Sequence, residues 1–191
     1  MGSTDEELLA RVRSGDDRAA FAELVRRHQA KVRSLLRRLT CGDHAKADDL
    51  AQETFLRAFR AAGQFEGRAQ LSTWLCTIAY RTFLAARRAG REELARSGDE
   101  LEDEDVGARA SDAMAKERAA PDRALLRHDV ERALARLPPA ERDALALTFG
   151  RDMTHEDAAR ILGCPLGTLK TNVARGLAKL ERHMRPWSET A

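Results

Sequence analysis

The stretch T-H-E-D-A-A-R-I-L-G-C-P-L-G-T-L-K-T-N, residues 154–172, decides how the second half of this chain folds. Thr154 predicts a capped start for one helix, because its hydroxyl can accept a backbone N–H of the first turn. Gly163 can adopt the left-handed backbone of a tight turn. Ala159 lets two helices pass closely, and Leu169 faces the small core between them. This spacing predicts a helix-turn-helix.

The exposed face of the second helix predicts contact with the major groove of double-stranded DNA. Lys and Arg can meet phosphates or guanine edges, Asn can pair with adenine, and Thr can bond to a base or a phosphate. The candidate residues are Thr168, Lys170, Thr171, Asn172, Arg175 and Lys179. The alternative is an ordinary helical hairpin with a solvated basic face, but the turn spacing and the polar face both favour DNA binding.

The rest of the chain predicts an all-α protein of two small helical domains. Apolar residues recur at spacings of three and four in both halves, and alternating strand patterns do not occur. The expected N-terminal helices cover about 4–15, 17–39, 45–62 and a segment from Ser72, a plausible N-cap, that fades at the basic run 87–91. The expected C-terminal helices cover about 122–136, 139–149, 154–163 and 165–182.

The middle of the chain loses the helical pattern and becomes acidic. Residues 92–121 carry a net charge of −6, against +6 for residues 1–91 and +2 for residues 122–191. Residues 99–105 read D-E-L-E-D-E-D, a run of like charges with almost nothing apolar to bury. We therefore expect an N-terminal helical domain over 1–91, a flexible acidic linker over 92–121 and a C-terminal helix-turn-helix domain over 122–191.

Cysteine usage and hydropathy exclude several classes of protein. Cys41, Cys76 and Cys164 lie far apart, at no spacing typical of a zinc site or a redox pair, so we expect free thiols and neither a metal nor another cofactor. The sequence has no signal peptide and no apolar run near the roughly 20 residues that span a bilayer. A cytoplasmic protein is therefore expected.

Two sets of motifs extend the interpretation to both halves of the chain. The first is D-D-L-A-Q-E-T-F-L-R-A-F at residues 48–59, followed by F-E-G-R-A-Q-L-S-T-W-L-C-T-I-A-Y-R at residues 65–81. The second is L-P-P-A-E-R-D-A-L-A-L at residues 137–147, followed by the stretch at 154–172. In this order and spacing they resemble the extracytoplasmic-function sigma factors, the small promoter-recognition subunits of bacterial RNA polymerase. The resemblance covers nearly the whole chain except the acidic middle.

The resemblance implies that the first domain docks on the clamp helices of the polymerase β′ subunit. Helical spacing is compatible with this role, because Asp48, Gln52 and Phe55 share a face that mixes charge with an apolar anchor. Leu50 also matches the family motif, but burial in the core is its simpler interpretation. The candidate core-binding residues are Asp48, Asp49, Gln52, Glu53 and Phe55.

The resemblance also implies that the first domain opens the promoter −10 element and holds it as single-stranded DNA, a task for basic grooves and aromatic platforms. The candidate residues are Phe65, Arg68, Gln70, Ser72, Thr73, Trp74, Arg81, Arg87 and Arg88. Trp74 lies at a spacing that also suits the core. The chain departs from the family pattern at Arg81, where Asn is common, and at Ala85, where Asp is frequent, so the preferred −10 sequence stays open.

The second domain is implied to read the −35 element as double-stranded DNA and to contact the β flap. The family often has Arg where Asn172 stands, so the −35 specificity stays open as well. The expected function is promoter-specific transcription initiation with core RNA polymerase, without covalent chemistry by this chain. An anti-sigma factor is a further expected partner, because control by such an antagonist is common in the family.

Two other functions are compatible with parts of the sequence. A stand-alone helix-turn-helix regulator that binds an operator as a dimer explains the C-terminal block but leaves residues 48–81 without a role. An enzyme such as a nuclease or phosphohydrolase is weakly suggested by Asp43, His44, Asp48 and Asp49, yet no supporting histidines follow at metal-ligand spacing.

Overall fold

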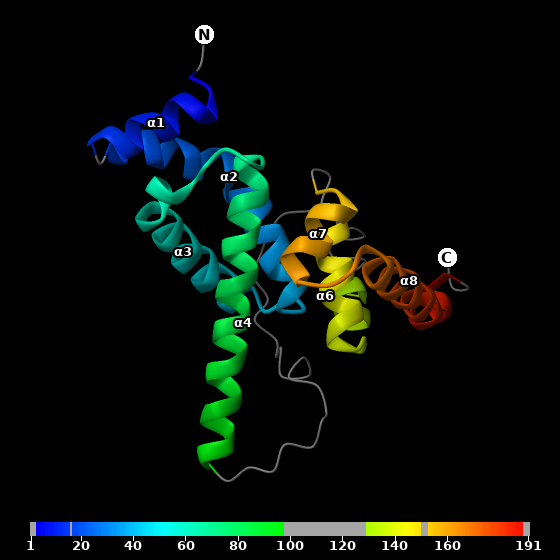
Figure 1. Ribbon diagram of the computed structural model, residues 1–191. Helices are drawn as coiled ribbons and strands as arrows, with labels where there is room; N and C mark the ends of the chain where they lie inside the picture. The colour runs from blue at the N-terminus through cyan, green and yellow to red at the C-terminus, as the bar shows by residue number, and fades with distance from the viewer. Residues whose placement is uncertain (1–2, 16, 98–128, 150–152, 189–191) are drawn as a thin grey trace.

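The computed structural model describes residues 3–15, 17–97, 129–149 and 153–188, and over these residues it is all-helical (Figure 1). The N-terminal half contains α1 (Asp5–Gly15), α2 (Arg18–Leu39), α3 (His44–Arg60), the 3-10 helix η1 (Ala62–Gln64) and α4 (Leu71–Ser97). The C-terminal half contains helical residues 129–135, α6 (Pro139–Thr148), α7 (His155–Leu162) and α8 (Leu166–Ser188). The expected all-α fold class is confirmed.

Side-chain caps start the helices that the sequence predicted. The backbone N–H of Thr4 donates to Glu7 Oε2 at 2.8 Å, and the N–H of Glu7 donates to Thr4 Oγ1 at 3.2 Å, a reciprocal capping box before α1. At α7 the N–H of Asp157 donates to Thr154 Oγ1 at 3.1 Å, while the Thr154 hydroxyl donates to the Asp157 carboxylate at 3.0 Å. Both caps satisfy backbone donors that have no partner inside the helix.

Two helices extend beyond their expected bounds. α4 begins at Leu71, so Ser72 lies in its first turn and not at the N-cap. The same helix continues through the basic run to Ser97, where the sequence pattern had predicted its end near 91. Arg96 pairs with glutamates three and four positions earlier, and such pairs stabilise a solvated helix that lacks an apolar face. α8 likewise continues past 182 to Ser188.

The expected acidic linker overlaps the structure only in part. Its residues 92–97 belong to α4. Its remainder, 98–121, lies outside the described residues, as does the beginning of the helix expected from residue 122. The two predicted boundaries, between residues 91 and 92 and between residues 121 and 122, therefore stay predictions.

The N-terminal half is built around α2, against which α1, α3 and α4 all pack. Leu24, Val32, Leu36 and Leu39 are buried along one face of this helix, at the helical spacing that the sequence shows. α3 and α4 also pack against each other. This scaffold positions the two surfaces that α3 and the segment before α4 present to solvent.

The C-terminal half contains the predicted helix-turn-helix, formed by α7 and α8. Gly163 ends α7 with φ 65° and ψ 34°, the left-handed conformation that the turn needs. Leu169 is fully buried between the helices. α8 lies close to α6 at Gly176, where an added Cβ would lie 2.9 Å from Leu145 Cδ1. The close approach explains why this helix position has no side chain.

The two halves are in direct contact in this structure. α6 packs against α2, and α7 packs against α4 (Figure 1). One continuous apolar cluster joins the N-terminal core to buried side chains of α6, α7 and α8, among them Ala144, Leu147 and Leu169. The sequence analysis predicted two separate helical domains and did not predict this shared core.

Candidate nucleic-acid and polymerase interfaces

The solvent-facing side of α8 carries the predicted −35 residues. Thr168, Lys170, Thr171 and Arg175 are exposed, and Asn172 is half-buried. Lys179 is different, because its ammonium group pairs with Glu141 of α6 at 2.8 Å. The first five residues are therefore directed for contact with a partner, while the sixth is already engaged in packing α8 onto α6.

A cavity of about 780 Å³ lies between α1, α2 and the loop 65–72. Its size is within the range of small-molecule sites, roughly 300–1,000 Å³. Residues from three segments line it, including Arg13, Arg27, His28, Gln70 and Ser72. The cavity thus brings three of the predicted −10 residues, Phe65, Gln70 and Ser72, next to basic side chains of α1 and α2 that the sequence analysis did not select.

Arg13 joins α1 to the loop that borders this cavity. Its guanidinium donates to the backbone carbonyl of Phe65 at 2.7 Å and reaches the carbonyl of Gly63 at 3.4 Å. The Phe65 ring packs on Trp74, with centroids 5.2 Å apart and planes inclined by 58°. Phe65 is only 8% exposed as a result. The ring is therefore part of the wall behind the loop and not a free stacking platform.

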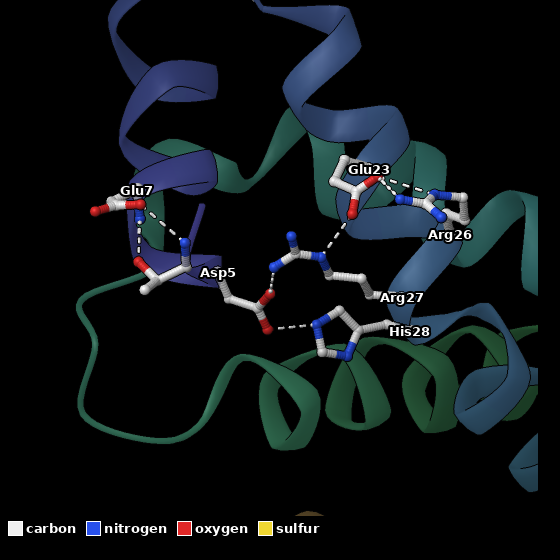
Figure 2. Close-up of polar contacts among 7 residues, drawn as sticks. Asp5, Glu7, Glu23, Arg26, Arg27 and His28 are labelled. Atoms are coloured by element: carbon white, nitrogen blue, oxygen red, sulfur yellow. Dashed lines mark hydrogen bonds and ion pairs between the residues drawn. The ribbon is translucent and has the colours of Figure 1, made fainter. Parts of the chain in front are cut away.

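A chain of ion pairs fixes the basic groups on the α2 side of the cavity (Figure 2). Asp5 accepts from Arg27 at 3.0 Å and lies 2.6 Å from His28 Nε2. Glu23 accepts from Arg27 at 2.7 Å and also from Arg26. Hydrogen bonds from Arg26 and then Arg27 hold the pKa of Glu23 below its usual value. Arg27 is therefore held between two carboxylates at the cavity wall.

The remaining predicted −10 residues differ in accessibility. Arg68 and Arg81 are exposed, and Arg68 pairs with Glu66 at 2.7 Å. Arg88 is exposed as well and Arg87 is half-buried, whereas Thr73 is buried and faces the interior of the N-terminal half. The structure thus brings Gln70, Ser72 and the loop together at the cavity. Arg68 lies in the segment before α4, and Arg81, Arg87 and Arg88 lie further along that helix.

The exposed side of α3 carries most of the predicted core-binding residues. Asp49 and Gln52 are exposed, and the half-exposed Asp48 and Glu53 pair with Arg33 and Arg57 at 3.3 and 2.6 Å. Phe55 is different, because it packs against the apolar core together with Phe21, Leu24 and Trp74. Phe55 therefore helps to pack α3 onto the core of the N-terminal half.

Leu56 is an exposed apolar side chain on this surface, one position after the Phe55 that sequence reasoning selected. Its side chain is 53% exposed, and it lies four and three positions after Gln52 and Glu53 on the same helical face. Adjacent helix positions differ by about 100°, so an error of one residue changes the face. The spacing 49, 52, 53, 56 contains the signal that would have identified it.

Two of the four residues that weakly suggested an enzyme, Asp43 and Asp48, have local structural roles. Asp43 caps α3 by accepting the backbone N–H of Lys46 at 3.0 Å. Asp48 pairs with Arg33. Among the described residues no group of three or more His, Cys, Asp or Glu side chains could hold a metal ion. In the same part of the chain, no helix is long and apolar enough to cross a membrane.

Comparisons with known proteins match both halves of the chain. The family model for sigma-70 region 2 matches residues 24–93, and that for sigma-70 region 4 matches residues 127–180. The RNA polymerase sigma-H factor of Pseudomonas aeruginosa is 33% identical over 95% of this chain and 94% of its own length. The ECF RNA polymerase sigma-E factor of Escherichia coli K12 is 34% identical over 96% and 95%.

The chain belongs to the extracytoplasmic-function sigma factor family. As a sigma factor it binds RNA polymerase and promoter DNA and directs promoter-specific transcription initiation. Sigma factors are regulatory, non-catalytic subunits of the polymerase. The family and function that the sequence motifs implied are thus confirmed, and the stand-alone regulator and the enzyme are not supported.

Solved structures share the fold. The sigma factor RpoE from Bartonella quintana, in complex with the anti-sigma factor NepR, is 26% identical with a TM-score of 0.68, over 86% of this chain and 96% of that one. CnrH, in complex with the cytosolic domain of CnrY, has a TM-score of 0.65 at 24% identity, over 95% and 97%. α1 precedes the region-2 match, so Arg13 lies outside the part that this family model covers.

Proposed function

We propose that the two halves of this sigma factor divide the recognition of one promoter between them. Residues 1–91 hold core polymerase and open and read the −10 element, and residues 122–191 read the −35 element and contact the β flap. Residues 92–121 connect them. The observation that carries this proposal is the exposed polar face of α8 directly after the left-handed turn at Gly163, on a half of the molecule separate from the cavity at α1 and α2.

At the −35 element, α8 enters the major groove with its N-terminal residues toward the bases. Lys170, Thr171 and Arg175 are exposed there, and the half-buried Asn172 can direct its amide at a base edge. Lys179 stays paired with Glu141 and contributes positive charge close to the phosphates without reading sequence. Base specificity therefore comes from the first two turns of α8.

At the −10 element, the cavity between α1, α2 and loop 65–72 receives a base extruded from the duplex. A captured base has to leave its stack, and a pocket with fixed polar groups offsets that cost. Gln70 and Ser72 supply hydrogen-bonding side chains at the cavity wall. Arg68, Arg81 and Arg88 follow the backbone of the opened strand through its phosphates.

On the polymerase side, the clamp helices of β′ contact the exposed face of α3. Asp49 and Gln52 provide polar contacts and Leu56 provides the apolar one, while Asp48 and Glu53 lie at the edge in ion pairs with arginines. Polar and charged groups around one apolar contact are the usual composition of such an interface. The chain performs no covalent chemistry, and it acts in the cytoplasm, where polymerase and chromosome are located.

An anti-sigma factor is a further partner of this chain. The support is that a solved structure of similar fold, the sigma factor RpoE at 26% identity, was obtained as a complex with the anti-sigma factor NepR. An antagonist of this type competes with core polymerase for the same chain.

The function is tested by mixing the purified chain with sigma-free core polymerase and a genomic promoter library and mapping transcript starts. We expect a stable complex with core and a set of starts that share spaced −35 and −10 sequences. Absence of both would contradict the proposal. A two-fold symmetric footprint without polymerase would instead identify a stand-alone regulator.

A further inference from the structure

The carboxylate of Asp5 is fixed at the wall of the cavity between α1, α2 and loop 65–72 (Figure 2). Its Oδ1 atom accepts from Arg27 at 3.0 Å, and its Oδ2 atom lies 2.6 Å from Nε2 of His28. Both partners belong to α2, whereas Asp5 is the first residue of α1. Because a separate contact holds each oxygen, the orientation of the carboxylate is set before any ligand enters the cavity.

The fixed carboxylate has acceptor capacity left for a ligand. A carboxylate has about four lone-pair sites, and Arg27 and His28 use one on each oxygen. The Asp5 side chain is 33% exposed, so its two partners do not cover it. The wall of the cavity therefore offers a hydrogen-bond acceptor whose position is set by the packing of α1 on α2.

The cationic groups of the same wall are directed at atoms of the protein. Arg27 donates to the carboxylates of Asp5 and Glu23, Arg13 donates to a backbone carbonyl of the loop, and the ammonium of Lys31 is buried. Two further carboxylates line the cavity, those of Glu6 and Glu66. The lining therefore suits a ligand that donates hydrogen bonds better than it suits an anion.

Nucleobases differ in the donors that they present to such a wall. Adenine, cytosine and guanine carry an exocyclic amino group, and carboxylates accept from such groups, as Asp and Glu do from N4 of cytosine. Thymine has a carbonyl oxygen and a methyl group instead. A carbonyl oxygen that faces a carboxylate brings two acceptors together, and neither is then satisfied.

We propose that Asp5 is a specificity-determining residue of the −10 site, and that its carboxylate accepts a hydrogen bond from the exocyclic amine of the captured base. This inference rests on the proposed capture of a base by the cavity. Arg27 and His28 are positioning residues, because they hold the carboxylate in place. Gln70 and Ser72 bind the base from the loop side. The site then accepts adenine, cytosine or guanine and discriminates against thymine.

The contribution of Asp5 comes from outside the family motifs. The region-2 family model matches residues 24–93, and α1 precedes them. The acceptor therefore belongs to a helix that the motifs do not include, while the side chains that hold it lie on α2 within the matched part. Base preference at the −10 element thus depends on how α1 packs on α2.

The test uses the full-length chain and single-stranded oligonucleotides of a −10 sequence recovered by transcript mapping. An abasic nucleotide at each position in turn identifies the captured base, because the loss at that position alone should shrink in Gln70→Ala. At that position adenine is compared with purine, and cytosine with 2-pyrimidinone. Each pair differs only in the amine.

Fluorescence anisotropy should show that the aminated base of at least one pair binds the wild-type chain about tenfold more tightly than its partner. In Asp5→Ala the two members of that pair should bind equally. The ratio within a pair cancels any general change in DNA binding that follows from removing a negative charge. The wild-type comparison needs no variant, so it tests the inference even if a substitution impairs folding.

Glu6→Ala is the matched control, since Glu6 is the next residue of α1, is exposed and lines the same cavity. It should leave the ratio at its wild-type value. A wild-type ratio near one for both pairs, or a ratio that Asp5→Ala leaves unchanged or that both variants change equally, would overturn the role of Asp5 while base capture stands. If no position is sensitive to an abasic nucleotide, base capture itself is overturned, and the role of Asp5 with it.

Discussion

The Arg13 guanidinium donates to the backbone carbonyl of Phe65 at 2.7 Å, across 52 positions of sequence, and ties α1 to the loop at the cavity. This contact fixes the backbone immediately before the residues proposed to capture a −10 base. α1 therefore contributes to the proposed −10 site although none of its residues was selected from the sequence.

Arg13→Ala should weaken binding of single-stranded −10 DNA by about 1–2 kcal/mol, because a hydrogen bond from a charged donor is lost and the loop is no longer fixed. Binding of a −35 duplex should not change. Fluorescence anisotropy with short oligonucleotides measures both. Arg11→Ala is the control, since Arg11 lies on the same helix and pairs with Asp17 at 2.7 Å, away from the loop. Equal losses in the two variants would contradict the assignment.

Asn172→Ala should reduce promoter use at one or two −35 positions by roughly 1–3 kcal/mol. The reason is that an amide reads a particular base edge, whereas a phosphate contact carries no sequence information. Transcription from a library randomised over the −35 element measures the effect. Lys179→Ala, which removes a side chain already paired with Glu141, should instead produce a small and uniform loss. A uniform loss for Asn172→Ala would mean that Asn172 touches only the DNA backbone.

Leu56→Ala should weaken binding to core polymerase by about 1–2 kcal/mol, roughly five- to thirtyfold, while leaving the fold intact. A side chain that is 53% exposed stabilises the free protein little. Surface plasmon resonance with immobilised core gives the affinity, and thermal unfolding checks stability. Leu177→Ala is the comparison, because Leu177 is 42% exposed on α8. The α3 surface is excluded if only the Leu177 variant binds more weakly.

Gly163→Ala should lower the free energy of unfolding by about 1–2 kcal/mol, because an L-residue is strained at φ 65°. The cost is conformational, since nothing lies within 4 Å of the added Cβ. Gly167→Ala, in the first turn of α8 and equally open, should be neutral or slightly stabilising because alanine favours a helix. Urea unfolding followed by circular dichroism distinguishes the two. Equal effects would mean that the turn tolerates other conformations.

Much of this fold was predictable because its determinants are local. The Thr4 and Thr154 caps, the left-handed Gly163 and the buried Leu169 all act within a few residues, and the structure contains each of them. The end of α4 was misjudged because its last two turns depend on charged pairs and not on an apolar pattern.

The contacts that sequence reasoning missed are the distant ones. Tyr80 and Asp143 are 63 positions apart, and periodicity does not indicate which helix a buried polar residue will meet. Arg87 was assigned to DNA from its charge alone, and the structure shows that charge paired within the chain. Leu56 was missed for a different reason. The sequence analysis assigned Phe55 to the exposed face of α3, whereas in the structure Phe55 packs against the core and Leu56, one position later, is exposed.

The close approach of α8 to α6 at Gly176 has a consequence for how promoter preference can change in evolution. Any larger side chain there meets Leu145, a residue of the core, so this contact requires glycine for α8 to lie as it does against α6. New promoter preferences can then arise when exposed side chains of α8 are replaced one at a time, because these side chains do not take part in its packing against α6. Such replacements change the groups offered to DNA and leave the buried contact between α8 and α6 intact.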